Sequence, residues 1–510
     1  MDMRLEHQHM ALEQPCGRCH SQFTVEGDVT LPGSLRESNN VLHASATAVV
    51  ESTEALQDRV SIKGRVVFCV LYTQGEAKRV ESIEATADFV HLCDIPGAVP
   101  RAEMYARAQI EHVEAHVQNG RMTMRAQVRV CARAMNGETL ELISRIDVPG
   151  IQQRTAAVRH RRTVGKGASD VLLREEFSLP ADLAIHETLA AWARADFHDT
   201  AGGQGRIGLS GEVQIEVLHA SDVPGKPLVM TRHSIPISQS VEITGENGEI
   251  LNGRILVKDV AVASQDMGDG ERTLRAEVLL GLSAWAEREE QTLLLTDAYT
   301  TVGDELRLTS IPVTVQTGTH RACAAESGKA SLLLPEGAKP LRTVLAAFAL
   351  PVMSSFVQQG SRLMVEGTLK TTVLYLAGDG EVPQSVRVEA PFRAAFAMSA
   401  QPEDMVMLSA GSVEAVPITS DRMELRYILH AEVDGVEAQQ VSAVTEAAAV
   451  PAAAPSQDIV LYFTQPGEGA WEISRRYRIP EQELKALNPD MNGEPKAGQG
   501  VVVWRRSLQS

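Results

Sequence analysis

The sequence predicts a mainly β protein, with three repeated β-sandwich or open-barrel-like domains followed by a small βααβ module. Three observations support this prediction. A self-similar pattern returns about every 150 residues, apolar and polar residues alternate within each copy, and an Ala/Pro-rich segment separates the last copy from a stretch with helical periodicity. A chain of 510 residues is also too long for a single hydrophobic core.

A glycine in front of an alternating apolar run marks the same place in each copy. Glycine inside a strand pattern indicates a bulge or a close backbone approach, so we expect one or the other at these positions. A Leu-Pro pair upstream and an arginine downstream keep register with each glycine. The landmarks are Gly64, Gly211 and Gly367; Leu31-Pro32, Leu179-Pro180 and Leu334-Pro335; and Arg125, Arg275 and Arg426.

These landmarks divide the chain into domains. The predicted repeats cover residues 21–150, 170–300 and 325–443, and short alternating runs separated by turn residues favour antiparallel sheets within them. We expect an N-terminal arm over 1–20, an Ala/Pro linker over 444–457 and the C-terminal module over 458–506. Only the stretches Leu341–Phe348 and Ala181–Ala193 suggest short helices inside the repeats.

The repeated arginines allow two interpretations. Arg125, Arg275 and Arg426 could contact a ligand, or they could lie on the solvent side of a strand and pair with nearby carboxylates. Exposed charges are common on strands and contribute little individually, so we expect the second arrangement.

The C-terminal module reads as strand, helix, helix, strand. A β-prone segment precedes a Pro-Gly turn, a short amphipathic stretch follows, and a proline suits the first turn of a second helix. An Asn-Pro pair then ends that helix, because the residue before proline avoids helical geometry. The expected segments are 459–463, 470–477, a helix from Pro480 to Asn488, and 501–504.

Four short motifs in this module resemble the LysM domain. They are Pro466-Gly467-Glu468-Gly469-Ala470-Trp471, Arg475-Arg476-Tyr477, Asn488-Pro489 and Ala497-Gly498-Gln499. The resemblance implies a shallow groove between the loops 465–470 and 488–492, which in LysM domains binds N-acetylglucosamine chains. The implied groove residues are Pro466, Gly467, Glu468, Gly469, Ala470, Trp471, Asn488, Pro489 and Met491.

Two positions of that groove depart from the LysM pattern. Glu468 replaces the usual Asp, and Gly469 replaces the usual Thr, so a hydroxyl partner for a sugar is missing. A site built to hydrogen-bond its ligand loses affinity when one partner is removed. The departures favour a protein ligand over a glycan.

The repeats resemble the SPOCS domain of sporulation proteins, whose opening pattern is found at Val25-Glu26-Gly27-Asp28-Val29-Thr30-Leu31-Pro32. Such repeats joined to a C-terminal LysM-like module resemble the SipL-like family of spore coat morphogenetic proteins. This resemblance implies a non-enzymatic scaffold in the mother-cell cytoplasm, at the forespore surface, whose LysM-like module binds the coat ATPase SpoIVA. Self-association through the repeats is a further expectation. The alternative is a peptidoglycan-binding cell-wall protein.

Composition narrows the classes of partner. The net charge of −18 disfavours binding to nucleic acid or to an anionic membrane surface. The N-terminus lacks an apolar run behind a basic head, and no apolar stretch reaches the length of a membrane span, which predicts a cytoplasmic protein. Six scattered cysteines predict reduced thiols.

One motif suggests an alternative function, the binding of haem or of a metal ion. Cys16-Gly17-Arg18-Cys19-His20 matches the c-type haem attachment string, and His7 with His9 would make zinc the better metal alternative. We expect an unliganded arm instead.

Gly165–Ser169 lacks the full phosphate-loop spacing and is expected to be a linker. With no His-Glu-x-x-His or Gly-x-Ser-x-Gly pattern, the sequence predicts no enzyme activity, no cofactor and no bound metal.

Overall fold

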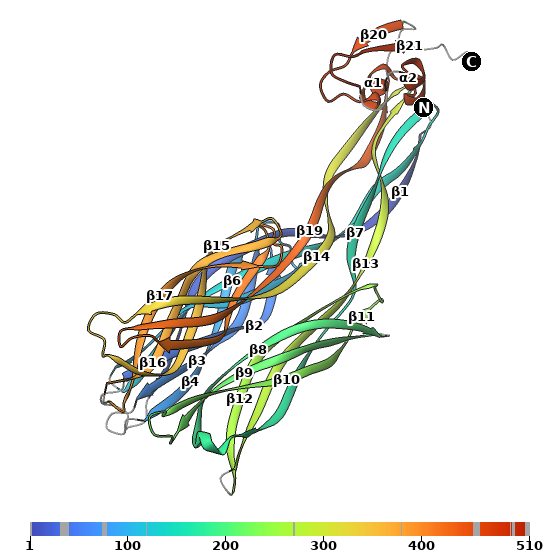
Figure 1. The fold of residues 1–510 in the computed structure, drawn as a ribbon. Helices are drawn as coiled ribbons and strands as arrows, with labels where there is room; N and C mark the ends of the chain where they lie inside the picture. The colour runs from blue at the N-terminus through green and yellow to red at the C-terminus, as the bar shows by residue number, and fades with distance from the viewer. Residues whose placement is uncertain are drawn as a thin grey trace.

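The computed structural model describes residues 3–30, 40–73, 79–118, 120–203, 205–268, 271–378, 380–451, 459–489, 491 and 495–504. It is mainly β, as the sequence predicts, and the three copies build elongated heads whose long strands continue into one stalk (Figure 1). The first copy comprises β1 (Arg4–Thr30), β2 (Asn40–Leu56), β3 (Arg59–Thr73), β4 (Val80–Asp94), β5 (Glu103–Gln118) and β6 (Arg121–Asp147).

The other two copies repeat this strand order. The second comprises β7 (Ile151–Leu179), β8 (Ile185–Gly203), β9 (Arg206–Ser221), β10 (Leu228–Glu242), the short β11 (Thr244–Gly245), β12 (Ile250–Gly268) and β13 (Glu271–Thr300). The third comprises β14 (Glu305–Leu333), β15 (Leu341–Gln359), β16 (Arg362–Ala377), β17 (Pro383–Phe396), β18 (Met405–Pro417) and β19 (Arg422–Val450).

Each copy folds into two antiparallel sheets around one core. In the first copy these sheets have the orders β1-β6-β5 and β2-β3-β4, and the edge strands β5 and β1 lie next to β2 and β4. The equivalent sheets are β7-β13-β12, extended by β11, with β10-β9-β8, and then β14-β19-β18 with β15-β16-β17. Alternating residues of the facing sheets fill the cores, for example Phe68 opposite Val128 in the first copy.

The copies are longer than the sequence predicts. Residues 4–20 of the expected arm lie in β1, the segments 151–169 and 305–324 lie in β7 and β14, and residues 444–450 of the expected linker belong to β19. The first three segments pair with the last strand of their own copy, and residues 444–450 pair with β14, so their backbone hydrogen bonds are satisfied as strands. Residues 452–457 of the expected linker, and Leu31-Pro32, lie outside the described residues.

The two predicted helices are wrong. Leu341–Phe348 forms the start of β15, and Ala181–Ala193 forms a 3₁₀ turn (Ala181–Leu183) followed by β8. Both strands pair with the central strand of their sheet, and this pairing overrides the helix propensity of their Ala and Leu residues.

The landmark glycines permit a close backbone approach, as expected. Gly64, Gly211 and Gly367 lie in the central strands β3, β9 and β16, and each faces a bulge in a neighbouring strand. A Cβ at these positions would lie 2.2, 2.3 and 2.2 Å from a carbonyl oxygen of that strand. The repeated signal is therefore a steric requirement.

The repeated arginines face solvent, also as expected. Arg125 pairs with Glu26 at 2.7 Å, Arg275 with Glu277 at 3.0 Å, and Arg426 with Glu424 at 2.8 Å. Each arginine side chain is about half exposed. They are surface ion pairs on equivalent strands.

The three heads pack against one another through equivalent positions. Leu71, Leu218 and Leu374 each follow the landmark glycine by the same spacing, and all three are fully buried. They share one apolar cluster to which Leu42 and Leu189 also belong. The copies are therefore arranged around a common pseudo-threefold axis.

Equivalent contacts continue into the stalk. The antiparallel strand pairs β1/β6, β7/β13 and β14/β19 extend beyond the heads and twist together (Figure 1), and their interior combines apolar side chains from all three, such as Leu12, Val158 and Val313. A bulge in each last strand carries a hydroxyl that donates to a carbonyl of the first strand. These pairs are Ser144 to Glu6 at 3.1 Å, Thr296 to Arg154 at 3.0 Å and Thr445 to Thr309 at 3.3 Å.

Ion pairs join the copies where the stalk meets the heads. Asp434 of the third copy binds Arg254 of the second and Arg133 of the first, the latter at 2.9 Å. Glu432 binds Arg107 and lies 3.7 Å from Arg321. These groups are largely buried, and apart from Arg321, which lies in the same copy as Glu432, each pairs with a charge of another copy.

We expect the protein to lose stability as the pH falls from about 6.5 towards 4. Burial, with a smaller contribution from Arg387, lowers the pKa of His43 to about 3, and burial with His233 lowers that of His219 to about 4. Between these values and the ordinary value of 6.5, the unfolded chain binds protons that the folded chain does not. Each histidine should therefore cost about 1.4 kcal/mol of unfolding free energy per pH unit in this range.

Urea denaturation at pH 7.5 and pH 5 measures this effect. Leu in place of His43, which stacks on Phe348 with ring centroids 4.1 Å apart, should make the decrease smaller. The exposed His116 is the control, and His116→Gln should leave the decrease unchanged. An equal decrease in His43→Leu and wild type would contradict the expectation.

Candidate functional site

The C-terminal module has its own small core. It consists of β20 (Ile459–Phe463), α1 (Ala470–Tyr477), α2 (Glu481–Leu487) and β21 (Gly500–Trp504), with β20 and β21 paired antiparallel. Ile473, Leu484 and Val501 are fully buried between the helices and the two-stranded sheet.

Helix α1 docks this module on the far tip of the stalk. The indole Nε1 of Trp471 donates to Asp297 Oδ2 at 2.7 Å, and Arg475 donates to the same oxygen at 2.9 Å. The ring of Trp471 meets Tyr299 edge-on, with centroids 4.9 Å apart. Trp471 is only 4% exposed, so an aromatic side chain and a charge-assisted hydrogen-bond pair carry the contact.

Backbone contacts strengthen the docking. Arg478 donates to the carbonyls of Thr300 at 2.9 Å and Gly303 at 2.6 Å, and Tyr299 donates its hydroxyl to the carbonyl of Ile479 at 2.8 Å. The module is thereby bound to the end of β13 and to the turn that leads into β14.

The second copy carries the residues that this docking needs. Asp297 directly follows the bulge hydroxyl of Thr296, and the residues in the same place are Arg145 in the first copy and Glu446 in the third. Tyr299 corresponds in the same way to Asp147 and Ala448. The other two strand pairs of the stalk therefore lack the Asp and Tyr pair that receives Trp471.

The structure does not bring the nine predicted groove residues together on one open surface. Trp471 faces the stalk, and Ala470 and Met491 are buried. The side chain of Asn488 donates to the carbonyls of Leu484 and Val502, both at 2.8 Å, and accepts from the Val502 N–H at 2.7 Å, which ties α2 to β21. Pro466, Gly467 and Pro489 are exposed.

The remaining two residues hold the loop before α1. Glu468 accepts from the hydroxyl of Tyr462 at 2.5 Å and pairs with Arg476. The hydrogen bond from Tyr462 is the main cause that lowers the pKa of Glu468. Gly469 is the N-cap of α1, and its N–H donates to Glu472 at 2.9 Å. Residues 490 and 492 of the second predicted loop lie outside the described residues.

An apolar strand face is the feature that the sequence interpretation missed. Ile459, Leu461 and Phe463 alternate along β20 and are 70%, 59% and 58% exposed. Val502 lies directly across from Leu461 on β21 and is also exposed. Five consecutive apolar residues in Ile459–Phe463 were the available signal, because a strand with one buried face needs only every second residue to be apolar.

The haem-like string does not converge on a metal position. It lies extended in β1, where Cys19 points into the core of the first copy and His20 lies on the other face, with Nδ1 3.1 Å from Cys131 Sγ. Cys16 donates to the carbonyl of Ala134 at 3.3 Å. In the part of the chain that the structure describes, no three His, Cys, Asp or Glu side chains gather as a metal-binding group. Likewise, none of the described helices is long and apolar enough to cross a bilayer.

The first copy also has a counterpart among known families. Residues 39–118 match the family model "SipL, SPOCS domain". The matched range holds β2 to β5 with the landmark Gly64, and it suggests a sporulation-related protein. The opening pattern at 25–32 lies before the matched SPOCS residues. Neither the curated proteins nor the solved structures include a match to the chain.

Proposed function

We propose that this protein is a non-enzymatic scaffold of spore-envelope assembly, whose C-terminal module is a LysM-like domain that binds a protein partner. The proposed partner is a coat-morphogenetic ATPase of the SpoIVA type, and the proposed location is the forespore surface in the mother-cell cytoplasm. The SPOCS match in the first copy supports the sporulation context.

The exposed face of β20 is the observation that favours a protein partner. Contiguous exposed apolar side chains mark protein contacts, and Leu461 and Phe463 lie at the centre of this face. A sugar groove would instead need free polar groups, and the side chains of Glu468 and Asn488 are bonded within the module. The docked helix α1 is on the other side of the module core, so β20 stays accessible.

Leu461→Glu in the full chain tests this proposal. A buried charge without a partner is costly, so affinity for purified SpoIVA should fall by about tenfold or more. Leu293→Glu is the matched control, because Leu293 on β13 is exposed to nearly the same extent, 57% against 59%. Biolayer interferometry measures binding, and circular dichroism checks the fold.

Asp297→Ala tests whether docking of the C-terminal module on the stalk is needed for binding of the partner. It removes the acceptor of Trp471 and Arg475 without touching β20, so the partner should still bind. Unchanged binding by Leu461→Glu would contradict the proposal. Sedimentation of the wild-type chain with peptidoglycan sacculi, abolished by changes at Pro466 and Gly467, would favour the cell-wall alternative.

A further inference from the structure

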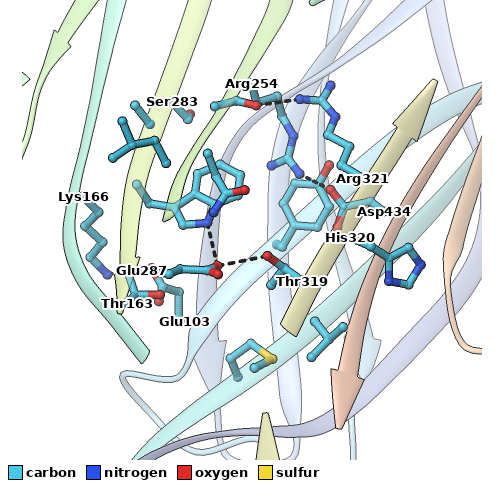
Figure 2. A pocket seen from close by; sticks show the side chains of 18 of the residues that line it. Glu103, Thr163, Lys166, Arg254, Ser283, Glu287, Thr319, His320, Arg321 and Asp434 are labelled. Atoms are coloured by element: carbon cyan, nitrogen blue, oxygen red, sulfur yellow. Dashed lines mark hydrogen bonds and ion pairs between the residues drawn. The ribbon is translucent and has the colours of Figure 1, made fainter. Parts of the chain in front are cut away.

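A cavity of about 830 Å³ lies where the three strand pairs of the stalk enter the heads, and all three copies line it (Figure 2). Its wall includes Tyr105 from the first copy, Trp285 and Glu287 from the second, and Gln316 and Thr319 from the third. This volume suits a small organic molecule.

The internal repeat identifies Glu287 as an unusual lining residue. A bulge in the first strand of each stalk strand pair lies opposite Met135 in the first copy, Glu287 in the second and Ala438 in the third. The fold therefore accepts an apolar residue at this place twice. Glu287 is nevertheless 1% exposed, so a carboxylate has been buried where the architecture does not need one.

The contacts of Glu287 are incomplete. Its Oε1 accepts from Trp285 Nε1 and from Thr319 Oγ1, each at 3.0 Å, and Figure 2 shows Glu287 and Thr319 pointing toward one another. Its Oε2 has no hydrogen-bond partner among the described residues, nor does Oε1 of Gln316, which is 2% exposed. Both atoms are acceptors, so the group that would satisfy them is a donor.

The cations of the cavity wall are paired with carboxylates other than Glu287, and Arg321 lies 3.7 Å from Glu432. Arg254 and Arg133 bind Asp434, and Lys166 binds Glu103 at 2.6 Å. A further carboxylate, Glu13, lies close enough to interact with Glu287, and burial is the main cause that raises its pKa. This side of the cavity therefore has carboxylates in excess of protein cations.

We propose that the cavity binds a small organic ammonium ion. Glu287 Oε2 and Gln316 Oε1 are covered by protein atoms in this structure, so the two side chains would turn toward the ion to accept from its N–H groups. An alkyl diamine has the right chemistry and size: an ammonium group for the carboxylate, and a short apolar chain to lie along Trp285 and Tyr105. The site is separate from the C-terminal module and does not depend on the proposed spore function.

Isothermal titration calorimetry of the full chain with 1,4-diaminobutane tests the site. Wild type should bind the diamine, and 1,4-butanediol, which has the same length and no charge, should bind at least about tenfold more weakly. Glu287→Gln should weaken diamine binding by about tenfold or more. Glu111→Gln is the matched control, because Glu111 is also a buried carboxylate, 8% exposed, but does not line the cavity.

Glu287→Met is a second test variant that is expected to fold, because it introduces the residue that the first copy carries at this position. It should melt at the wild-type temperature or above and should not bind the diamine. Absence of diamine binding to wild type would mean a water-filled cavity and would overturn the proposal. Equal affinity of wild type and Glu287→Gln would also overturn it, as would butanediol or Ca²⁺ binding as tightly as the diamine.

Discussion

Alanine in place of Asp434 is expected to lower the free energy of unfolding by about 3–5 kcal/mol, because the substitution leaves two buried guanidinium groups without their counter-charge. Asp434 is 8% exposed and binds Arg254 and Arg133, which belong to the two other copies. Urea denaturation at pH 7.5 measures the loss. Because these ion pairs join different copies, the substitution should weaken the contacts between the three heads more than the folding of each single head.

The charge state of Asp434 supports this expectation. Burial acts to raise its pKa, but Arg254 and Arg133 outweigh burial, and the pKa lies below the ordinary value of 3.8. The stabilisation is therefore present above that value and is lost as the pH falls through the folded pKa. Glu26→Ala is the control, because its pair with Arg125 is exposed and should contribute less than about 1 kcal/mol. A loss of that small size in Asp434→Ala would contradict the prediction.

Alanine in place of Gly64 is expected to destabilise the first copy by about 3 kcal/mol, as an overpacked core position does. The new Cβ would lie 2.2 Å from the carbonyl oxygen of Val49 and 2.7 Å from a ring carbon of Phe89. Backbone cannot move aside as a side chain can, so the bulge in β2 would have to rearrange. Thermal denaturation followed by circular dichroism measures the effect.

Gly137→Ala provides the matched control for this prediction. Gly137 also lies inside a strand, β6, but a Cβ there would meet no atom within 4 Å. Alanine at this site should be neutral or slightly stabilising, because it restricts the unfolded chain. Gly211→Ala and Gly367→Ala should behave like Gly64→Ala, and a neutral result at all three positions would mean that the repeated glycine has no steric role.

The head domains were predictable because their signals are local. Gly64 and its equivalents sit in a period-two pattern, and the pattern alone indicates a strand with a close neighbour. The stalk was not predictable, because residues such as Met10 and Leu12 find their partners in the other two copies. The stretch Leu341–Phe348 combines strong helix formers, and only its pairing with β16 makes it a strand.

The same distinction applies to the candidate site. The segments of the C-terminal module carry local turn and periodicity signals, whereas the environment of Trp471 depends on Asp297, which is 174 residues away in sequence. Trp471 was therefore assigned to an open groove from its place in a LysM-like motif, although its ring faces the stalk. The unbroken apolar run Ile459–Phe463 indicates the exposed face of β20, but this run lies outside the LysM-like motifs.

The docking of α1 on Asp297 and Tyr299 gives the molecule two mechanical connections at one end. The chain enters the C-terminal module from β19 of the third copy, while α1 holds the tip of β13 in the second. A pulling force on the module is thus shared between two of the strand pairs in the stalk. Such a force would act parallel to the long strands and would load many of their inter-strand hydrogen bonds in shear at the same time. The stalk would therefore resist stretching between the module and the three heads.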